Sequence, residues 1–171
     1  MGVMKMAGNR LGRLIGREDG SSIIELAVVF PILLLLFVAT AELGRLFHTY
    51  TTLAKATKTG ARYLSVQRDV KSADPTKVAA AKLRAQNMVV CGDTTGCAGR
   101  EPIVYGLDTN DPANSVKVTL PLVTDPVKYV KVEIQNATFK VGVFNLAAMV
   151  GTANSTFYFP LSPGTQMRYL E

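Results

Sequence analysis

REDGSSIIELAVVFPILLLLFVATAELGR, residues 17–45, is the stretch that decides the fold. A charged end is followed by Gly-Ser-Ser, and sixteen residues without a charge then separate Glu25 from Glu42. A helix from Ser21 to Ala41 would be roughly 31 Å long, close to the thickness of the hydrocarbon core of a bilayer. The sequence therefore predicts one transmembrane helix over residues 21–41.

An acid and a proline interrupt this apolar run. A carboxylate costs about 2.5 kcal/mol or more at the centre of a bilayer and less near its edge. From the residues alone, Glu25 is therefore either a functional group or a marker of the water boundary. Pro31 removes one backbone hydrogen bond and is predicted to kink the helix, which neighbouring helices in a membrane accommodate.

A second interpretation of this segment is a secretory signal peptide. A basic start, an apolar run and the tripeptide Ala39-Thr40-Ala41 fit such a signal, with cleavage after Ala41. The run is long for that purpose, however, and Pro31 falls in its middle. In the secreted alternative the remaining chain would be a soluble binding domain.

The pattern beyond Ala41 favours a single continuing helix. Apolar or small residues recur at steps of three and four, which is the spacing of one helical face. They are Leu43, Leu46, Phe47, Tyr50, Ala54, Thr57, Ala61 and Leu64. Lys55, Lys58 and Arg62 fall off this face. We therefore expect the transmembrane helix to continue as an amphipathic helix over residues 42–67.

The leader, residues 1–20, indicates the orientation of the span. Its basic residues, Lys5, Arg10, Arg13 and Arg17, outweigh Glu18 and Asp19 and leave a net charge of +2. Basic residues before a span favour a cytoplasmic N-terminus. The chain after the span would then lie on the other side of the membrane.

Residues 68–171 are predicted to form a separate α+β domain. Asp74-Pro75 is a typical helix start, with Asp at the N-cap and Pro in the first turn, and the helix should end before Gly92. Cys91 and Cys97 flank five turn-prone residues. In an oxidising compartment a disulfide is the expected state of this pair, with free thiols as the alternative.

The rest of this domain shows the alternation of half-buried strands. One strand would place Val116, Val118, Leu120 and Leu122 on a single face, and a second would do so with Val130, Val132 and Ile134. Pro121 indicates an edge strand. We also expect a short helix over residues 143–151, a last strand at TQMRYL, residues 165–170, and an antiparallel sheet lying against the long helix.

No motif for catalysis, for a metal ion or for a cofactor is found in the sequence. It lacks a phosphate-binding loop and a nucleophile motif, and it has one histidine, His48. The net charge of +6 is spread along the chain without interleaved aromatic residues, which argues against nucleic acid as a partner. The sequence therefore predicts neither an enzyme nor a nucleic-acid-binding protein.

The basic leader, the G-SSIIE motif, the proline within an apolar helix and the amphipathic continuation together resemble a type IV prepilin. The sequence EDGSSIIELAVVFPILLLLFVATAELGRLF, residues 18–47, is similar to that of the TadE-like minor pilins, or pseudopilins, of the tight-adherence (Flp) pilus system. The resemblance extends from about Arg17 to Gln67, and the C-terminal GTQMRYLE resembles the closing strand of that family.

The resemblance implies a pilin-like fold and specific roles for four residues. A prepilin peptidase would cut after Gly20 and leave Ser21 as the new N-terminus. Glu25 would be the acid of the fifth mature position, and Pro31 the proline of the family pattern. The new amine of Ser21 and Glu25 of a neighbouring helix would pair and set the register between subunits, since removing one partner of a buried ion pair typically costs several kcal/mol.

The function implied is that of a minor pilin that contributes to pilus assembly, adhesion and biofilm formation. The protein would lie in the bacterial inner membrane as a single-pass subunit with a periplasmic C-terminal domain, and would enter the extracellular pilus. Its partners would be the prepilin peptidase, other pilins, the inner-membrane assembly platform and the lipid bilayer. Another alternative is a membrane-anchored scaffold of the pilus machinery that stays outside the fibre.

Overall fold

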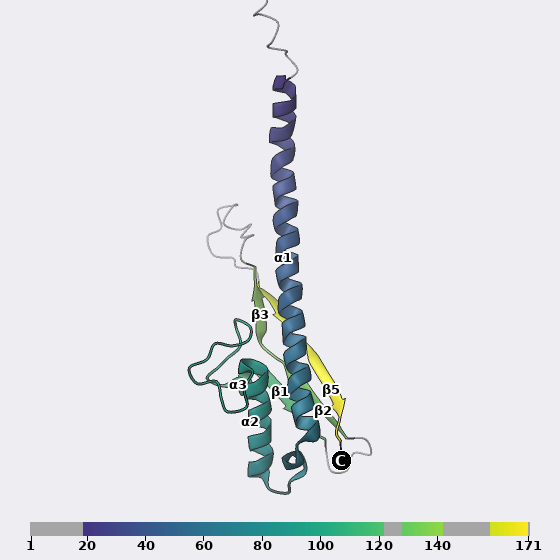
Figure 1. The fold of residues 1–171 in the computed structure, drawn as a ribbon, viewed down its shortest axis with the longest axis vertical. Helices are drawn as coiled ribbons and strands as arrows, with labels where there is room; N and C mark the ends of the chain where they lie inside the picture. Colours follow the sequence, from purple (N-terminus) through teal and green to yellow (C-terminus); the bar gives the residue numbers. More distant parts are fainter. Residues whose placement is uncertain (1–18, 122–127, 142–157, 171) are drawn as a thin grey trace, which may run out of the picture. The chain divides into compact units, whose positions relative to one another are not determined.

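The computed structural model describes residues 19–121, 128–141 and 158–170 (Figure 1). The chain divides into two compact units, with the boundary between Ala41 and Glu42. The elements in chain order are α1 (Asp19–Val66), η1 (Arg68–Lys71), α2 (Pro75–Cys91), α3 (Pro112–Ser115), β1 (Val116–Thr119), β2 (Tyr129–Ile134), β3 (Ala137–Lys140), β4 (Tyr158–Leu161) and β5 (Gly164–Arg168). A long apolar helix, a second helix and antiparallel sheets confirm the predicted α+β fold.

Helix α2 begins and ends where the sequence predicts. The Asp74 side chain accepts a hydrogen bond from the backbone N–H of Thr76, and Pro75 occupies the first turn. Gly92 ends the helix in the left-handed conformation, with φ at 75°, which an L-residue with a side chain adopts only with strain. Both ends are therefore determined by local chemistry that is visible in the sequence.

The three-stranded sheet has the order β1-β2-β5, and both pairs are antiparallel. Its central strand, β2, buries Val130, Val132 and Ile134 completely, as their alternation predicts. β1 is an edge strand that ends at Thr119, so Leu120 and Pro121 of the predicted strand lie beyond it. A second, two-stranded sheet of β3 and β4 was not predicted.

Three of the predicted features lie outside the described residues. They are the basic leader up to residue 18, the short helix expected over residues 143–151, and Leu122 at the end of the first predicted strand. The last strand is confirmed as β5, which runs from Gly164 to Arg168 and therefore ends before Tyr169.

The core of the second unit forms where the C-terminal part of α1 meets α2 and β2. Leu53, Ala61 and Leu64 of α1 are completely buried there. At Gly60 a Cβ atom would lie 2.5 Å from Cγ2 of Val89 on α2 and 3.8 Å from Cγ1 of Val132 on β2. The two helices therefore approach each other closely because Gly60 has no side chain.

The chain segment after β5 fixes the end of α1. The Tyr169 hydroxyl donates a hydrogen bond of 2.8 Å to the carbonyl oxygen of Gln67, and the Leu170 N–H donates one of 3.0 Å to that of Ser65. Lys71 lies over the Tyr169 ring, with its Nζ 4.6 Å from the ring centroid. These contacts join the C-terminal segment of the chain to the end of α1 and to η1.

Two glycines of α1 provide a matched test of this packing. Gly60→Ala should lower the free energy of unfolding by about 1–3 kcal/mol, because the added methyl overlaps buried Val89. Gly44→Ala should raise it by about 0.5–1 kcal/mol, because no atom lies within 4 Å and alanine favours the helix. Urea denaturation of the full chain in detergent measures both, and equal effects of the two substitutions would contradict the packing described here.

Candidate functional site

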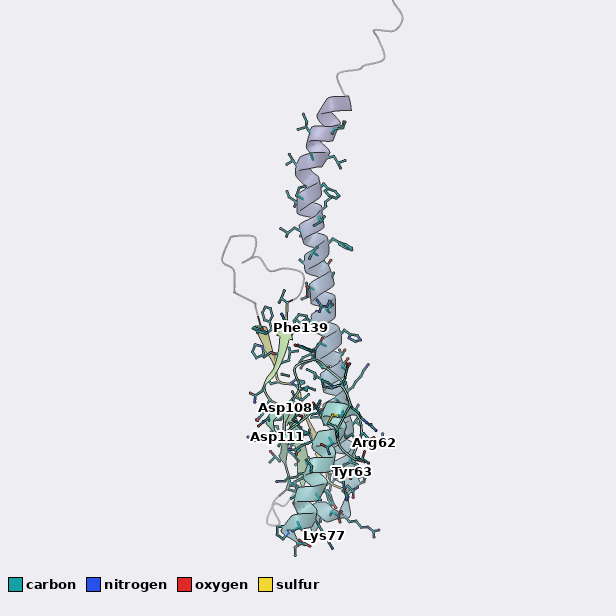
Figure 2. The ribbon with its side chains drawn as sticks, turned by 90° about the vertical axis from the view of Figure 1, so that its left-hand side faces the viewer. Arg62, Tyr63, Lys77, Asp108, Asp111 and Phe139 are labelled. Atoms are coloured by element: carbon teal, nitrogen blue, oxygen red, sulfur yellow. A yellow bond between two sulfur atoms is a disulfide. The ribbon has the colours of Figure 1, made fainter. Side chains whose placement is uncertain are left out.

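The N-terminal part of α1 presents apolar side chains in every direction (Figure 2). The large apolar residues from Ile23 to Phe37 are between 41% and 74% exposed. Among the described residues, one helix, Ser22–Val66, is long and apolar enough to cross a membrane, with a mean hydropathy of 2.7 in its most apolar window. A helix that is apolar all round has its stable environment in lipid or among other helices, which indicates membrane anchoring.

The residues singled out by the resemblance lie along this helix. Gly20 and Ser21 are in the first turn of α1, and Glu25 follows one turn later, four residues after Ser21. Residues four apart share a helical face. Glu25 is exposed and has no hydrogen bond or ion pair within the part of the chain that the structure describes. Pro31 lies inside α1, and the helix continues past it.

The predicted amphipathic face divides into two parts. Thr57, Ala61 and Leu64 are buried in the second unit, as a packed face requires. Leu43, Phe47 and Tyr50, by contrast, are between 46% and 59% exposed. The predicted apolar face is therefore covered by the second unit in its later part and exposed in its first part. The steps of three and four in the sequence could not predict this exposure, because they identify a helical face but not the element that covers it.

A charged pair, Glu42 and Arg45, lies at the start of the second unit. Nη1 of Arg45 donates hydrogen bonds of 3.0 and 3.2 Å to the two carboxylate oxygens of Glu42. The Glu42 side chain is 10% exposed and that of Arg45 is 55% exposed. The guanidinium of Arg45 also lies over the Phe139 ring, with Cζ 5.7 Å from the ring centroid. Two neighbours therefore orient the Arg45 side chain.

A pocket of about 530 Å³ lies in the second unit next to this pair. It is formed by three segments: α1, the loop that follows α2, and β3. Its lining residues are Arg45, His48, Thr49, Thr52, Ile103, Val104, Tyr105, Thr138, Phe139 and Lys140. The sequence did not predict it, because the segments that form it are up to 95 residues apart.

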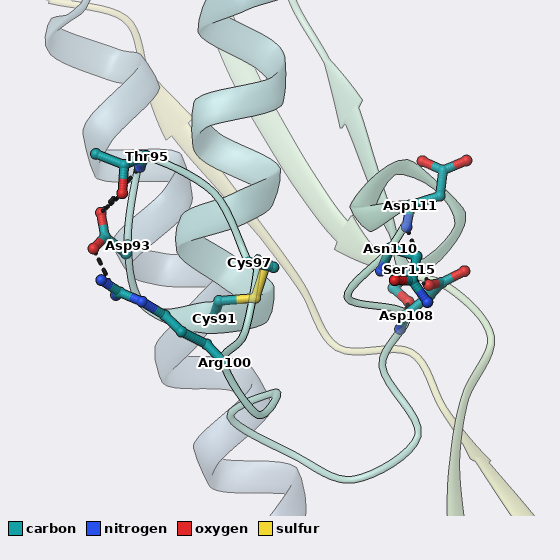
Figure 3. The surroundings of a disulfide bond; sticks show 9 residues. All are labelled: Cys91, Asp93, Thr95, Cys97, Arg100, Asp108, Asn110, Asp111 and Ser115. Atoms are coloured by element: carbon teal, nitrogen blue, oxygen red, sulfur yellow. Dashed lines mark hydrogen bonds and ion pairs between the residues drawn. A yellow bond between two sulfur atoms is a disulfide. The ribbon is translucent and has the colours of Figure 1, made fainter.

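The loop that follows α2 is fixed by a disulfide. Cys91 and Cys97 are bonded, with their Cα atoms 5.5 Å apart, which is the pairing that the sequence predicts. Asp93 accepts hydrogen bonds from the N–H and hydroxyl of Thr95 and pairs with Arg100 (Figure 3). The Thr95 bonds and Arg100 together hold the pKa of the Asp93 carboxyl below its usual value.

A second turn follows in the same loop, around Asp108. Its carboxylate accepts hydrogen bonds from the N–H groups of Asp111 and Asn110 and from the side chain of Asn114. These bonds, that of Asp111 foremost, lower the pKa of the Asp108 carboxyl. No group of three or more metal-ligating His, Cys, Asp or Glu side chains occurs within residues 19–121, 128–141 and 158–170.

Comparison with known proteins gives one match, and it falls on α1. The family model described as TadE-like protein matches residues 20–62. Residues 20–62 are TadE-like. The match supports a TadE-like protein of the Tad pilus system, and it begins at Gly20 and includes Glu25 and Pro31. No curated protein and no solved structure matches the chain.

The TadE-like segment crosses the boundary between the two units. It contains the exposed apolar residues of α1 and also Leu53 and Ala61 of the buried core. The matched segment contains four of the pocket residues, Arg45, His48, Thr49 and Thr52. The other residues that line the pocket lie outside the match. The second unit is thus built on a helix of which residues 42–62 belong to the TadE-like match.

The turn around Asp108 should make the second unit sensitive to acid. Because folding lowers this pKa, the carboxylate stabilises the fold above its unfolded pKa, and that stability is lost as the pH falls through the folded value. The melting temperature should fall between about pH 5 and about pH 3. Asp108→Asn should reduce that dependence, since the amide oxygen still accepts hydrogen bonds but does not titrate. Thermal unfolding at both pH values measures this.

Glu101→Gln is the matched control. Glu101 is exposed and has no hydrogen bond or ion pair within the described part of the chain. Replacing its carboxylate should leave the pH dependence of the melting temperature as it is in the parent protein. An Asp108→Asn protein with the parent's full loss of melting temperature would show that this turn does not contribute.

Proposed function

We propose that this protein is a minor pilin, or pseudopilin, of a tight-adherence type IV pilus. The observation that carries the proposal is the TadE-like match at residues 20–62, which starts at the glycine of the expected cleavage site. Residues 21–41 anchor the protein in the inner membrane, with residues 1–20 in the cytoplasm. Residues 42–67 and the domain at residues 68–171 lie on the periplasmic side.

Processing by a prepilin peptidase would supply the partner that Glu25 lacks. A cut after Gly20 creates an amine at Ser21, one helical turn before Glu25. In a bundle of such helices, the amine of one subunit meets Glu25 of its neighbour when the helices are offset along their axes. Removing one member of a buried pair leaves the other charge uncompensated, so the pair sets the register of assembly.

The exposed residues of α1 support a role in assembly. The apolar surface from Ile23 to Phe37 fits a bilayer before assembly and a bundle of pilin helices afterwards. Leu43, Phe47 and Tyr50 extend that apolar surface past the end of the span. Large exposed apolar surfaces mark sites of protein or membrane contact. Other pilins and the inner-membrane assembly platform are the partners that fit this surface.

The role proposed is structural and not enzymatic. The protein contributes to adhesion and biofilm formation through the pilus that it helps to assemble. A scaffold that stays outside the fibre would need the same anchor but no amine at Ser21. A secreted domain cleaved after Ala41 would lose both Ser21 and Glu25. Its signal sequence would have the same length and apolar composition as a transmembrane helix.

Substitution of Glu25 tests the proposal. Glu25→Ala should leave cleavage after Gly20 intact but lower incorporation into sheared pili by about tenfold or more, because the Ser21 amine loses its partner. Glu25→Asp is the control, since it keeps the charge and should retain most of the incorporation. Immunoblots of the membrane and pilus fractions measure both steps. Normal incorporation of Glu25→Ala would contradict the register role, and absence of the parent protein from pili would favour the scaffold.

A further inference from the structure

The pocket between α1, β3 and the loop after α2 has the chemistry of an anion site. Arg45 and Lys140 contribute two positive charges to its lining. No acidic side chain is among the lining residues that the structure describes. Glu42, which is not a lining residue, accepts hydrogen bonds from Nη1 of Arg45. We propose that this pocket binds the phosphate of an anionic phospholipid headgroup.

Arg45 is oriented for such a ligand. The hydrogen bonds to Glu42 use one terminal nitrogen, Nη1, and the Phe139 ring lies against the guanidinium. A guanidinium has five N–H donors, so those on Nη2 and Nε remain for a phosphate oxygen. Glu42 and Phe139 thus hold the Arg45 side chain in place, which reduces the entropy lost when a ligand binds.

Lys140 of β3 provides the second charge. It is exposed at the end of β3 and makes no ion pair with any described residue. The hydroxyls of Thr49 and Thr52 donate to the carbonyl oxygens of Arg45 and His48, so their remaining capacity is to accept hydrogen bonds. They fit the hydroxyl groups of a glycerol headgroup better than they fit phosphate oxygens.

The pocket also has apolar lining residues, which favour a lipid over a free anion. Ile103, Val104, Tyr105 and Phe139 line it, and Tyr105 is 84% exposed. Inorganic phosphate has no apolar part to place against them, whereas the glycerol backbone and first methylene groups of a phospholipid do. Aromatic side chains with a polar group are typical of the membrane interface.

The position of Arg45 in the chain makes lipid available to the pocket. It follows Ala41, the last residue of the expected span, by four residues. Four residues extend over at most about 14 Å, so Arg45 stays near the bilayer surface however the two units are arranged. The span therefore keeps the pocket at a high local concentration of headgroups. The proposal depends on membrane anchoring by α1 and not on entry into a pilus.

Native mass spectrometry of the full chain in detergent tests this proposal. The probes are phosphatidylglycerol, zwitterionic phosphatidylcholine and inorganic phosphate. The parent protein should retain one phosphatidylglycerol in preference to phosphatidylcholine. The double variant Arg45→Gln, Lys140→Gln should bind phosphatidylglycerol about thirtyfold more weakly, given the usual contribution of each basic residue near a lipid surface.

The matched control removes the same charge elsewhere on α1. Lys55→Gln, Lys58→Gln changes two exposed lysines that are not among the pocket residues, and binding should be unchanged. Lys140→Gln alone breaks no ion pair of the described structure and should still weaken binding, which separates loss of the site from loss of folding. Lys140→Arg keeps the positive charge and should bind phosphatidylglycerol as the parent protein does.

Three results would overturn the proposal. Equal losses in the two double variants would show a general attraction to charged lipid without a site. Equal retention of phosphatidylglycerol and phosphatidylcholine would exclude recognition of an anionic headgroup. Inorganic phosphate that displaces the lipid at a comparable concentration would identify a site for a soluble anion. Because none of these measurements involves pili, they leave the proposed pilin role untouched.

Discussion

The need to keep the apolar surface of α1 out of water governs the rest of this structure. Side chains from Ile23 to Phe37 are exposed on all sides of the helix. At about 25 cal/mol per Å² of apolar surface, such a helix is strongly driven into lipid or against other helices. Glu25 is the exception within it, and it lacks a partner among the described residues. The proposed pairing between subunits would satisfy the apolar and the charged requirement together.

The same helix serves a second purpose after Ala41. Leu53, Ala61 and Leu64 form part of a soluble core with α2 and β2, and Gly60 permits the close approach of α2. Backbone and hydroxyl hydrogen bonds from Leu170 and Tyr169 then fix the end of α1. The last part of α1 is therefore an integral part of the domain and not a linker to it. Loss of this part of α1 would remove its buried side chains from the core and expose the residues of α2 and β2 that pack against it.

Local chemistry made α2, the central strand and the disulfide predictable. Asp74-Pro75 and Gly92 mark helix ends by their own backbone and side-chain preferences, and the alternation of Val130, Val132 and Ile134 specifies a face. The second sheet and the pocket depend on segments that meet only after folding, such as β3 beside α1. The exposure of Leu43, Phe47 and Tyr50 could not be predicted either, because helical spacing shows a face but not what covers it.

We propose that the mature protein begins at Ser21 and keeps the rest of α1. The intact mass of the protein isolated from its native membranes tests this directly. We expect a chain that lacks residues 1–20 and starts at Ser21, with the Cys91–Cys97 disulfide in place. A chain that starts at Glu42 would contradict it, because the apolar helix would then be a removed signal and the remaining protein a secreted domain.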